Sequence, residues 1–298
     1  MPELPEVETI RRQLEPKIVG KTITDIEIIC PKSFQGDPKK IIGKKIISLT
    51  RIGKQLSINL SGNWVILAHF KMTGGLFFKP NKYTRVIIKT KIPLDKGGAR
   101  RAGDLSRQIN KSPPLASSAR DPLCQEGFLY FSDLRKFGWL KLFTQKSLKS
   151  FQKNLGLDAL SPNLTPAIFY QLLHSSSRPI KLVLLDQSKF AGIGNIYAND
   201  ALFKSKIHPQ KPANKISRSQ SAALLLNLQK IMSESILHGG STARDRGYIM
   251  PDGQAGSHQD HFLVYGRENE PCLSCSVKIK RIKQGGRSTF YCPHCQKL

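Results

Sequence analysis

Four cysteines near the C-terminus have the spacing of a metal site. Cys272 and Cys275 form one CxxC pair, and Cys292 and Cys295 form a second pair after 16 intervening residues. Four thiolates in two such pairs suit the tetrahedral coordination of one Zn²⁺ ion, with iron or disulfides as the alternatives. Since no ligand position stays open, the ion would be structural rather than catalytic. The many basic residues between the pairs predict a zinc-held hairpin that contacts phosphates or a groove, unless they are only a solvated face.

The N-terminus offers a different chemistry. The chain begins Met1-Pro2-Glu3, and proline after methionine normally permits removal of the initiator Met. Pro2 would then carry a free secondary amine, whose pKa of about 8 leaves a usable neutral fraction at neutral pH. Such an amine can attack a carbon at the aldehyde oxidation level to form an iminium, and the adjacent Glu3 carboxyl can transfer protons. An ordinary helix start is the alternative, which composition alone favours.

The charge of the chain indicates a polyanionic partner. Lys and Arg total 47 and Asp and Glu total 21, a formal charge of +26 over 298 residues. This argues against an enzyme of small acidic metabolites and for nucleic acid or an anionic membrane surface. A membrane is disfavoured because the sequence has neither a run of about 18 apolar residues nor an apolar signal region. Cysteine usage of this kind suits a reducing compartment and therefore predicts a cytoplasmic protein.

Hydrophobic alternation predicts strands throughout the first half of the chain. A helix precedes them, because Pro5 suits a first helical turn and Val7, Ile10 and Leu14 share one face. Short strands at roughly ten-residue spacing favour an antiparallel sandwich or barrel. The predicted strands fall at 25–28, 45–51, 55–60, 64–70, 84–90, 128–133 and 139–143.

Residues 91–126 interrupt this pattern. The segment has no aromatic residue and is rich in Pro, Gly, Ser and Arg. A loop of this length inside a compact domain is either disordered or functional, and its composition favours disorder. We therefore expect a dispensable insertion.

From about residue 147 the hydrophobic period becomes helical. Gly239 and Gly240 would end the longest helix, and a polar loop over 241–260 and one strand over 262–266 would lead to the cysteine module. The predicted helices are 164–174, 179–187, 195–205 and 217–238. The fold class expected from the whole chain is α+β multidomain.

Seven segments carry a resemblance to a known family. They are MPELPEVETIRR (1–12), RIGKQL (51–56), HFKMTGGL (69–76), DLRKFG (133–138), DQSKFAGIGNIYANDALF (186–203), GGSTARD (239–245) and GGRSTFYC (285–292). In this order they resemble the formamidopyrimidine-DNA glycosylases, bacterial enzymes of oxidised-purine repair, over the whole chain. The sister enzymes that remove oxidised pyrimidines typically begin PEGPE, whereas this chain has PELPE.

The resemblance implies an architecture of three parts. An N-terminal helix on an antiparallel β-sandwich would form the catalytic domain over 1–146, with 91–126 as its insertion. A helical domain with a helix–two-turn–helix motif would bind DNA over 147–261, and a zinc finger hairpin would follow over 262–298.

The resemblance also implies four catalytic residues. Pro2 would be the nucleophile on C1′ of the damaged nucleotide, and Glu3 the acid that assists base departure and sugar-ring opening. Lys54 would contact phosphate and donate a proton in β-elimination. Arg287 would grip phosphate and donate a proton in δ-elimination. Without the resemblance, Lys54 would be read as a solvated lysine.

Further residues are implied in DNA binding. Met72, Arg135 and Phe137 would fill the space left by the flipped nucleotide, since attack on C1′ requires it out of the stack. Lys181 would line the base pocket, and Asn195 would hold phosphate at a helix N-terminus. The remaining expected contacts are Tyr83, Arg178 and, in a lesion-sensing loop over about 241–259, Arg244.

Two positions depart from the family. Lys136 stands where a second arginine is common and keeps the charge without the guanidinium fork. Tyr83 stands where histidine is common, which puts that contact in doubt, although the nearby Arg85 could compensate.

The expected function is a monomeric, bifunctional DNA glycosylase and abasic-site lyase acting on oxidised purines in duplex DNA. It would need one structural zinc ion and no soluble cofactor, and it would work at the bacterial nucleoid. The alternatives are an oxidised-pyrimidine glycosylase of the same family and a non-catalytic zinc protein that binds damaged DNA. The second alternative predicts loss of Pro2, Glu3 or Lys54, yet all three are present.

Overall fold

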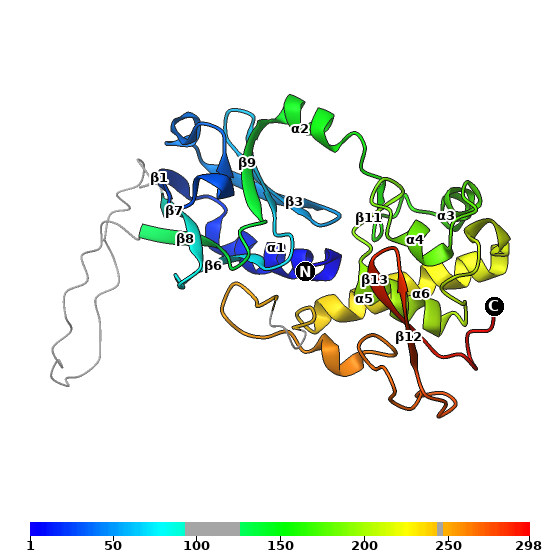
Figure 1. Ribbon diagram of the computed structural model, residues 1–298. Helices are drawn as coiled ribbons and strands as arrows, with labels where there is room; N and C mark the ends of the chain where they lie inside the picture. The colour runs from blue at the N-terminus through cyan, green and yellow to red at the C-terminus, as the bar shows by residue number, and fades with distance from the viewer. Residues whose placement is uncertain (93–125, 243–246) are drawn as a thin grey trace, which may run out of the picture.

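The computed structural model describes residues 1–92, 126–242 and 247–298. Strands of the first half gather on one side, and helices with a C-terminal hairpin gather on the other (Figure 1). The insertion expected over 91–126 lies outside the described residues except for its outermost positions. Arg244 also lies outside the described residues. Within the described ranges no helix is both long and apolar enough to cross a membrane.

Helix α1 (Leu4–Ile18) opens the chain as the sequence predicts. Pro5 lies in its first turn, and Glu6 turns back to accept a hydrogen bond from the backbone nitrogen of Glu3, one half of a capping box. Val7 and its neighbours on one face are buried in the core of the sandwich, while Leu4 belongs to the core of the second half. The helix therefore joins the two halves of the molecule.

Two sheets form the expected sandwich. One has strand order β2-β9-β5-β4-β3 and the other β1-β7-β8-β6. The pairing of β2 with β9 is parallel. The strands are β1 (Thr22–Ile28), β2 (Phe34–Gln35), β3 (Ile46–Ile52), β4 (Gln55–Leu60), β5 (Trp64–His69), β6 (Gly74–Phe77), β7 (Thr84–Lys91), β8 (Glu126–Asp133) and β9 (Trp139–Thr144).

The second half is helical, also as predicted. Its helices are α2 (Gln145–Gln152), α3 (Pro166–His174), α4 (Ile180–Leu184), α5 (Asn195–Lys204) and α6 (Arg218–Leu237). Thr165 and Ser217 cap α3 and α6 with their hydroxyl groups. A short parallel pair, β10 (Leu157–Asp158) with β11 (Phe190–Ala191), was not predicted.

The strand predicted over 262–266 is wrong. The backbone nitrogens of Leu263, Val264 and Tyr265 donate at 3.0–3.1 Å to the carboxylate of Asp200 on α5 instead of to a neighbouring strand. The apolar residues of this segment are therefore explained by burial and not by strand pairing, because the Asp200 side chain accepts the hydrogen bonds of the backbone nitrogens.

The predicted C-terminal hairpin is confirmed as β12 (Lys280–Gln284) paired with β13 (Arg287–Tyr291). It is fastened to the helical half by polar side chains. Asn199 accepts from the backbone nitrogen of Phe290 at 2.9 Å. Gln284 and Gln296 donate at 3.2 and 2.8 Å to backbone carbonyls in the segment that follows α5. The hairpin is therefore held in one orientation beside α5.

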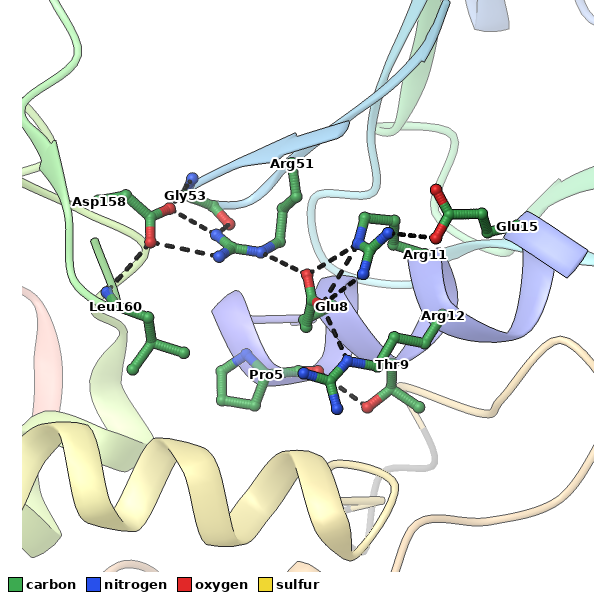
Figure 2. Close-up of polar contacts among 10 residues, drawn as sticks. All are labelled: Pro5, Glu8, Thr9, Arg11, Arg12, Glu15, Arg51, Gly53, Asp158 and Leu160. Carbon is green, nitrogen blue, oxygen red and sulfur yellow. Dashed lines mark hydrogen bonds and ion pairs between the residues drawn. The ribbon is translucent and has the colours of Figure 1, made fainter. Parts of the chain in front are cut away.

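An arginine on β3 clamps the two halves together (Figure 2). Arg51 donates to Glu8 on α1 at 3.1 Å and to Asp158 on β10 at 2.5 and 3.2 Å. Asp158 also accepts from the backbone nitrogen of Gly53 at 2.7 Å. Burial opposes ionisation of Glu8, but hydrogen bonds from Arg11 and then from its neighbour on the helix lower its pKa to about 2.

Loss of the Asp158 charge should weaken this clamp. The side chains of Arg51 and Asp158 are only 10% and 16% exposed, so Asp158→Asn leaves a poorly hydrated guanidinium. We expect the free energy of unfolding to fall by about 3 kcal/mol, the lower end for breaking a buried pair. Urea denaturation checks this, with Asp25→Asn of the exposed Asp25–Lys89 pair as the control that hardly moves the midpoint. Equal midpoints for wild type and Asp158→Asn would contradict the clamp.

Candidate functional site

A cavity of ≈ 220 Å³ lies where the N-terminus meets both halves of the molecule. Its walls come from the β3–β4 turn, the end of β5, the segments around α4 and β11, and the C-terminal hairpin. The lining residues are Met1, Ile52, Gly53, Lys54, Gln55, His69, Lys71, Leu155, Leu185, Gln187, Ala191 and Arg287.

Pro2 and Glu3 are buried beside this cavity, with Glu3 only 4% exposed. One Glu3 carboxyl oxygen, Oε1, accepts from the backbone nitrogen of Ile196 in the first turn of α5 at 3.2 Å. The other, Oε2, is buried and has no hydrogen-bond partner among the described residues. The helix end anchors one oxygen and leaves the second free to form a further hydrogen bond.

Two glycines before α5 make this burial possible. A Cβ at Gly194 would lie 1.9 Å from Glu3 Cδ, and a Cβ at Gly192 would lie 2.5 Å from Leu4 Cδ1. Gly192 also adopts φ +101°, which favours glycine. The glycine-rich segment and the N-terminal segment are therefore one structural unit.

Lys54 lies in the turn between β3 and β4 and is 8% exposed, so it is not the solvated lysine that its local sequence suggests. Burial lowers the pKa of Lys54, and the charge of Glu3 opposes that shift. Burial likewise raises the pKa of Glu3, against the opposing charge of Lys54. Both groups are thus shifted toward their neutral forms, which suits a carboxyl that donates a proton and an amine that exchanges one.

Arg287, the first residue of β13, is exposed and also lines the cavity. The next residue, Ser288, is gripped through its carbonyl by Lys181 Nζ at 2.9 Å and by Asn195 Nδ2 at 3.0 Å. Lys181 also donates to Thr289 Oγ1 at 2.7 Å. The helical half therefore fixes the strand that presents Arg287.

Lys181, the residue expected at a base pocket, donates its hydrogen bonds to the C-terminal hairpin. Its side chain is fully buried, between α4 and the hairpin. Burial, and then the charge of Arg287, lower its pKa to about 7. Asn195, expected at phosphate, is half-buried and points its amide to the same hairpin.

Met72, Arg135 and Phe137 come together on two adjacent loops. Met72 is 38% and Phe137 55% exposed, and the Arg135 guanidinium lies 5.0 Å from the centre of the Phe137 ring. Asp133 orders the loops, because its carboxylate accepts from Thr73 Oγ1 at 2.5 Å and from the Arg135 backbone nitrogen at 3.1 Å. Solvent-exposed apolar side chains held this firmly are suited to contact with a partner.

The remaining expected contacts lie apart from the cavity lining. Tyr83 is half-buried at a second cavity of ≈ 280 Å³ that also includes Thr73 and Leu134. Arg178 is exposed and forms an ion pair with Asp186 at 3.1 Å.

His69 is a lining residue that the sequence interpretation missed, although it begins the HFKMTGGL segment. Its Nδ1 accepts from the backbone nitrogen of Lys71 at 3.1 Å, and its ring lies 5.6 Å from that of Trp139. Burial, and then the charge of Lys71, lower its pKa to about 3. His69 is therefore a neutral imidazole in the cavity wall.

The four C-terminal cysteines form the predicted metal site. The sulfur atoms of Cys272, Cys275, Cys292 and Cys295 all lie within 4.8 Å of one another. Sulfur–sulfur distances of 3.9 Å (Cys272 to Cys295) and 3.4 Å (Cys275 to Cys292) are compatible with Zn–S bonds of about 2.3 Å in a tetrahedron. The cluster fits one structural zinc ion with no open position.

Three stretches of the chain match models of known protein families. Residues 1–140 match the formamidopyrimidine-DNA glycosylase N-terminal domain, 155–246 match its H2TH domain, and 269–298 match a zinc finger found in FPG and IleRS.

Individual relatives and solved structures give the same result. The formamidopyrimidine-DNA glycosylases of Pelotomaculum thermopropionicum and Exiguobacterium sp. are 36% and 34% identical over 100% of both chains. The crystal structure of MutM (Fpg) from Thermus thermophilus has a TM-score of 0.81 at 33% identity and covers 99% of this chain and 98% of its own. A Lactococcus lactis FPG mutant in complex with DNA containing Fapy-dG has a TM-score of 0.81 at 29% identity, with 100% of both chains covered. Since the similarity runs from end to end and includes all three parts, the chain belongs to the formamidopyrimidine-DNA glycosylase family and is a DNA-repair glycosylase.

Proposed function

We propose that this protein is a bifunctional DNA glycosylase and abasic-site lyase that excises oxidised purines, such as 8-oxoguanine and formamidopyrimidines, from duplex DNA. The observation that carries the proposal is the Glu3 carboxyl. It is buried next to Pro2, its pKa is raised, and one oxygen is left without a partner among the described residues. It also interacts electrostatically with Lys54, which lines the cavity together with Arg287.

The reaction begins once Met1 has been removed. The neutral amine of Pro2 attacks C1′, the glycosidic bond breaks, and the base leaves with a proton from Glu3, which regains a proton from the Pro2 ammonium. Glu3 then protonates the sugar ring oxygen, so that the ring opens and an iminium joins Pro2 to C1′. Loss of a C2′ proton expels the 3′ phosphate in β-elimination, with Lys54 as the proton donor, and Arg287 serves δ-elimination of the 5′ phosphate.

The exposed loops support the flipped-nucleotide geometry that this attack requires. Met72 and Phe137 are apolar and project into solvent, and Arg135 lies against the Phe137 ring. Together they offer a wedge and a stacking surface for the base left unpaired when a nucleotide leaves the helix. Five further residues are also proposed to contribute to DNA binding: Tyr83, Arg178, Lys181, Asn195 and Arg244.

The wider setting is part of the proposal. The substrate is duplex DNA, which suits a chain of charge +26. We place the enzyme in the cytoplasm as a monomer, with the catalytic domain over 1–146, the DNA-binding helical domain over 147–261 and the zinc finger over 262–298.

A second substrate class has one observation in its favour. Wild-type Lactococcus lactis FPG, 29% identical to this chain, has been solved in complex with DNA containing an oxidised pyrimidine. Single-turnover excision from duplexes with 8-oxoguanine opposite C and with thymine glycol distinguishes the two classes. Faster excision of thymine glycol would favour the pyrimidine alternative.

Borohydride should trap a covalent adduct between this protein and an 8-oxoguanine duplex. Reduction fixes the iminium, so the DNA-bearing peptide should begin at Pro2. A chain that retains Met1 should give no adduct, because the Pro2 nitrogen is then an amide. Mass spectrometry of the digested adduct makes the assignment, and an adduct on Lys54 would refute it.

Glu3→Gln should slow base excision and change its pH dependence. We expect excision to fall by about 100-fold or more, since general acid catalysis of this kind is worth that much. Because the pKa of Glu3 is raised, wild-type excision should decline as the pH rises through that pKa. The variant should lack this decline. Single-turnover rates from pH 5 to about 9 check both points, and an unchanged profile in the variant would contradict the role of Glu3.

Removal of zinc should weaken DNA binding without unfolding the sandwich. The free energy of metal binding contributes to folding of the hairpin. Chelation or Cys292→Ser should therefore release the strand that carries Arg287. Fluorescence anisotropy measures binding, and circular dichroism measures the remaining fold. Cys30→Ser is the matched control, because Cys30 lies outside the cluster. Equal affinity of the stripped protein would exclude the hairpin from DNA binding.

A further inference from the structure

Glu6 is a buried acid that the proposed reaction does not use. It lies in the first turn of α1 and is 1% exposed. Its Oε2 accepts from the backbone nitrogen of Glu3 at 2.8 Å. Its Oε1 accepts from Tyr197 Oη at 2.5 Å and from the backbone nitrogen and hydroxyl of Ser241 at 3.0 and 3.2 Å.

Every one of these contacts requires an acceptor on Glu6. Tyr197 has one hydroxyl proton, and burial raises the pKa of that hydroxyl well above its usual value, so it stays a donor. Ser235 Oγ, 2.6 Å from Tyr197 Oη, can then donate to the tyrosine oxygen. A glutamine at position 6 would turn an NH₂ group toward donors, whereas a carboxylate satisfies all of them.

The four contacts join elements that lie far apart in the sequence. The Glu3 bond fixes the backbone next to Pro2, where the nucleophile must be aimed. Tyr197 belongs to α5, and Ser241 directly follows the Gly239–Gly240 pair at the end of α6. At Gly240 a Cβ would lie 3.0 Å from Glu6 Cγ, so the chain leaving α6 packs directly on this carboxylate.

We propose that Glu6 is a positioning residue that holds the N-terminal nucleophile and Ser241 in one shared geometry. The inference rests on the proposed function, because it concerns the aim of Pro2. Oε2 sets the direction of the backbone that carries Pro2, and Oε1 ties that backbone to α5 and to Ser241. A rigid joint of this kind costs nothing at the moment of reaction, since its bonds already exist in the free protein.

The test compares Glu6→Gln with wild type in two assays. One is borohydride trapping on a duplex with a preformed abasic site, which needs an aimed Pro2 but no base removal. The other is single-turnover excision of 8-oxoguanine. At saturating DNA we expect both rates to fall roughly tenfold or more, as for one misdirected buried hydrogen bond. The Kd for abasic DNA should stay the same.

Glu15→Gln is the matched control. It is the same substitution on the same helix, but Glu15 is 40% exposed and pairs with Arg11. Both rates should equal those of wild type. A wild type that gives no trapping would remove the proposed function itself, whereas an active wild type with an equally active Glu6→Gln variant would overturn only the positioning role.

Two further results decide the inference. Normal trapping with slow excision would overturn the N-terminal part, because Glu6 would then act through Ser241 alone. A loss that merely follows the unfolded fraction in thermal melting would also overturn it. Should Glu6→Gln not fold, Tyr197→Phe and Ser241→Ala each remove one donor from Oε1. Severalfold slower trapping in both then supports the inference, and unchanged trapping in both opposes it.

Discussion

The candidate site depends on the absence of a side chain at Gly194. A Cβ there would lie 1.9 Å from Glu3 Cδ, inside any permissible contact. Because the position is bare, the first turn of α1 rests on the start of α5, and the Ile196 amide reaches Glu3 across 193 sequence positions. Helix α1 can then enter the cores of both halves, and the turn carrying Lys54 packs against Ala191 and Gly192. The geometry of the candidate site and the joint between the halves thus have a common steric origin.

Electrostatics add a second constraint at the same place. Lys54 and Lys181 both interact electrostatically with the buried Glu3 carboxyl, Arg287 acts on both lysines, and the two lysines are themselves buried. Burial penalises every charged form. The pKa of Glu3 is therefore raised, and the pKa values of Lys54 and Lys181 are lowered. Arg287 differs from them because it lies at the surface. In the proposed reaction, the buried Glu3 and Lys54 therefore transfer protons, and the exposed Arg287 guanidinium binds phosphate.

Local sequence predicts those parts of the molecule whose causes are local. Helix caps and apolar faces identified α1 and α6, and cysteine spacing identified the metal site. Glu6 and Asp158 were missed, because they have partners far away in the sequence and nothing nearby distinguishes them from ordinary polar residues. The segment 262–266 misled for the same reason, since Asp200 supplies from afar the hydrogen bonds that a strand neighbour would give. His69 was missed although it begins the HFKMTGGL segment. The resemblance supplied candidate roles, which stay predictions, while the structure supplied their proximity.

The exposed loops show how the same fold maintains an apolar tip in water. Met72 and Phe137 would be expected to collapse onto the surface, because exposed apolar area is unfavourable. Two features oppose this. Asp133 accepts from the Thr73 hydroxyl in one loop and from the Arg135 backbone nitrogen in the other, and the Arg135 guanidinium at 5.0 Å covers one face of the Phe137 ring. The ring is thereby oriented before any partner arrives, so the ordering cost is met during folding rather than binding. The loops and the N-terminal segment follow one principle, in which buried polar groups fix the position of the neighbouring side chains and backbone.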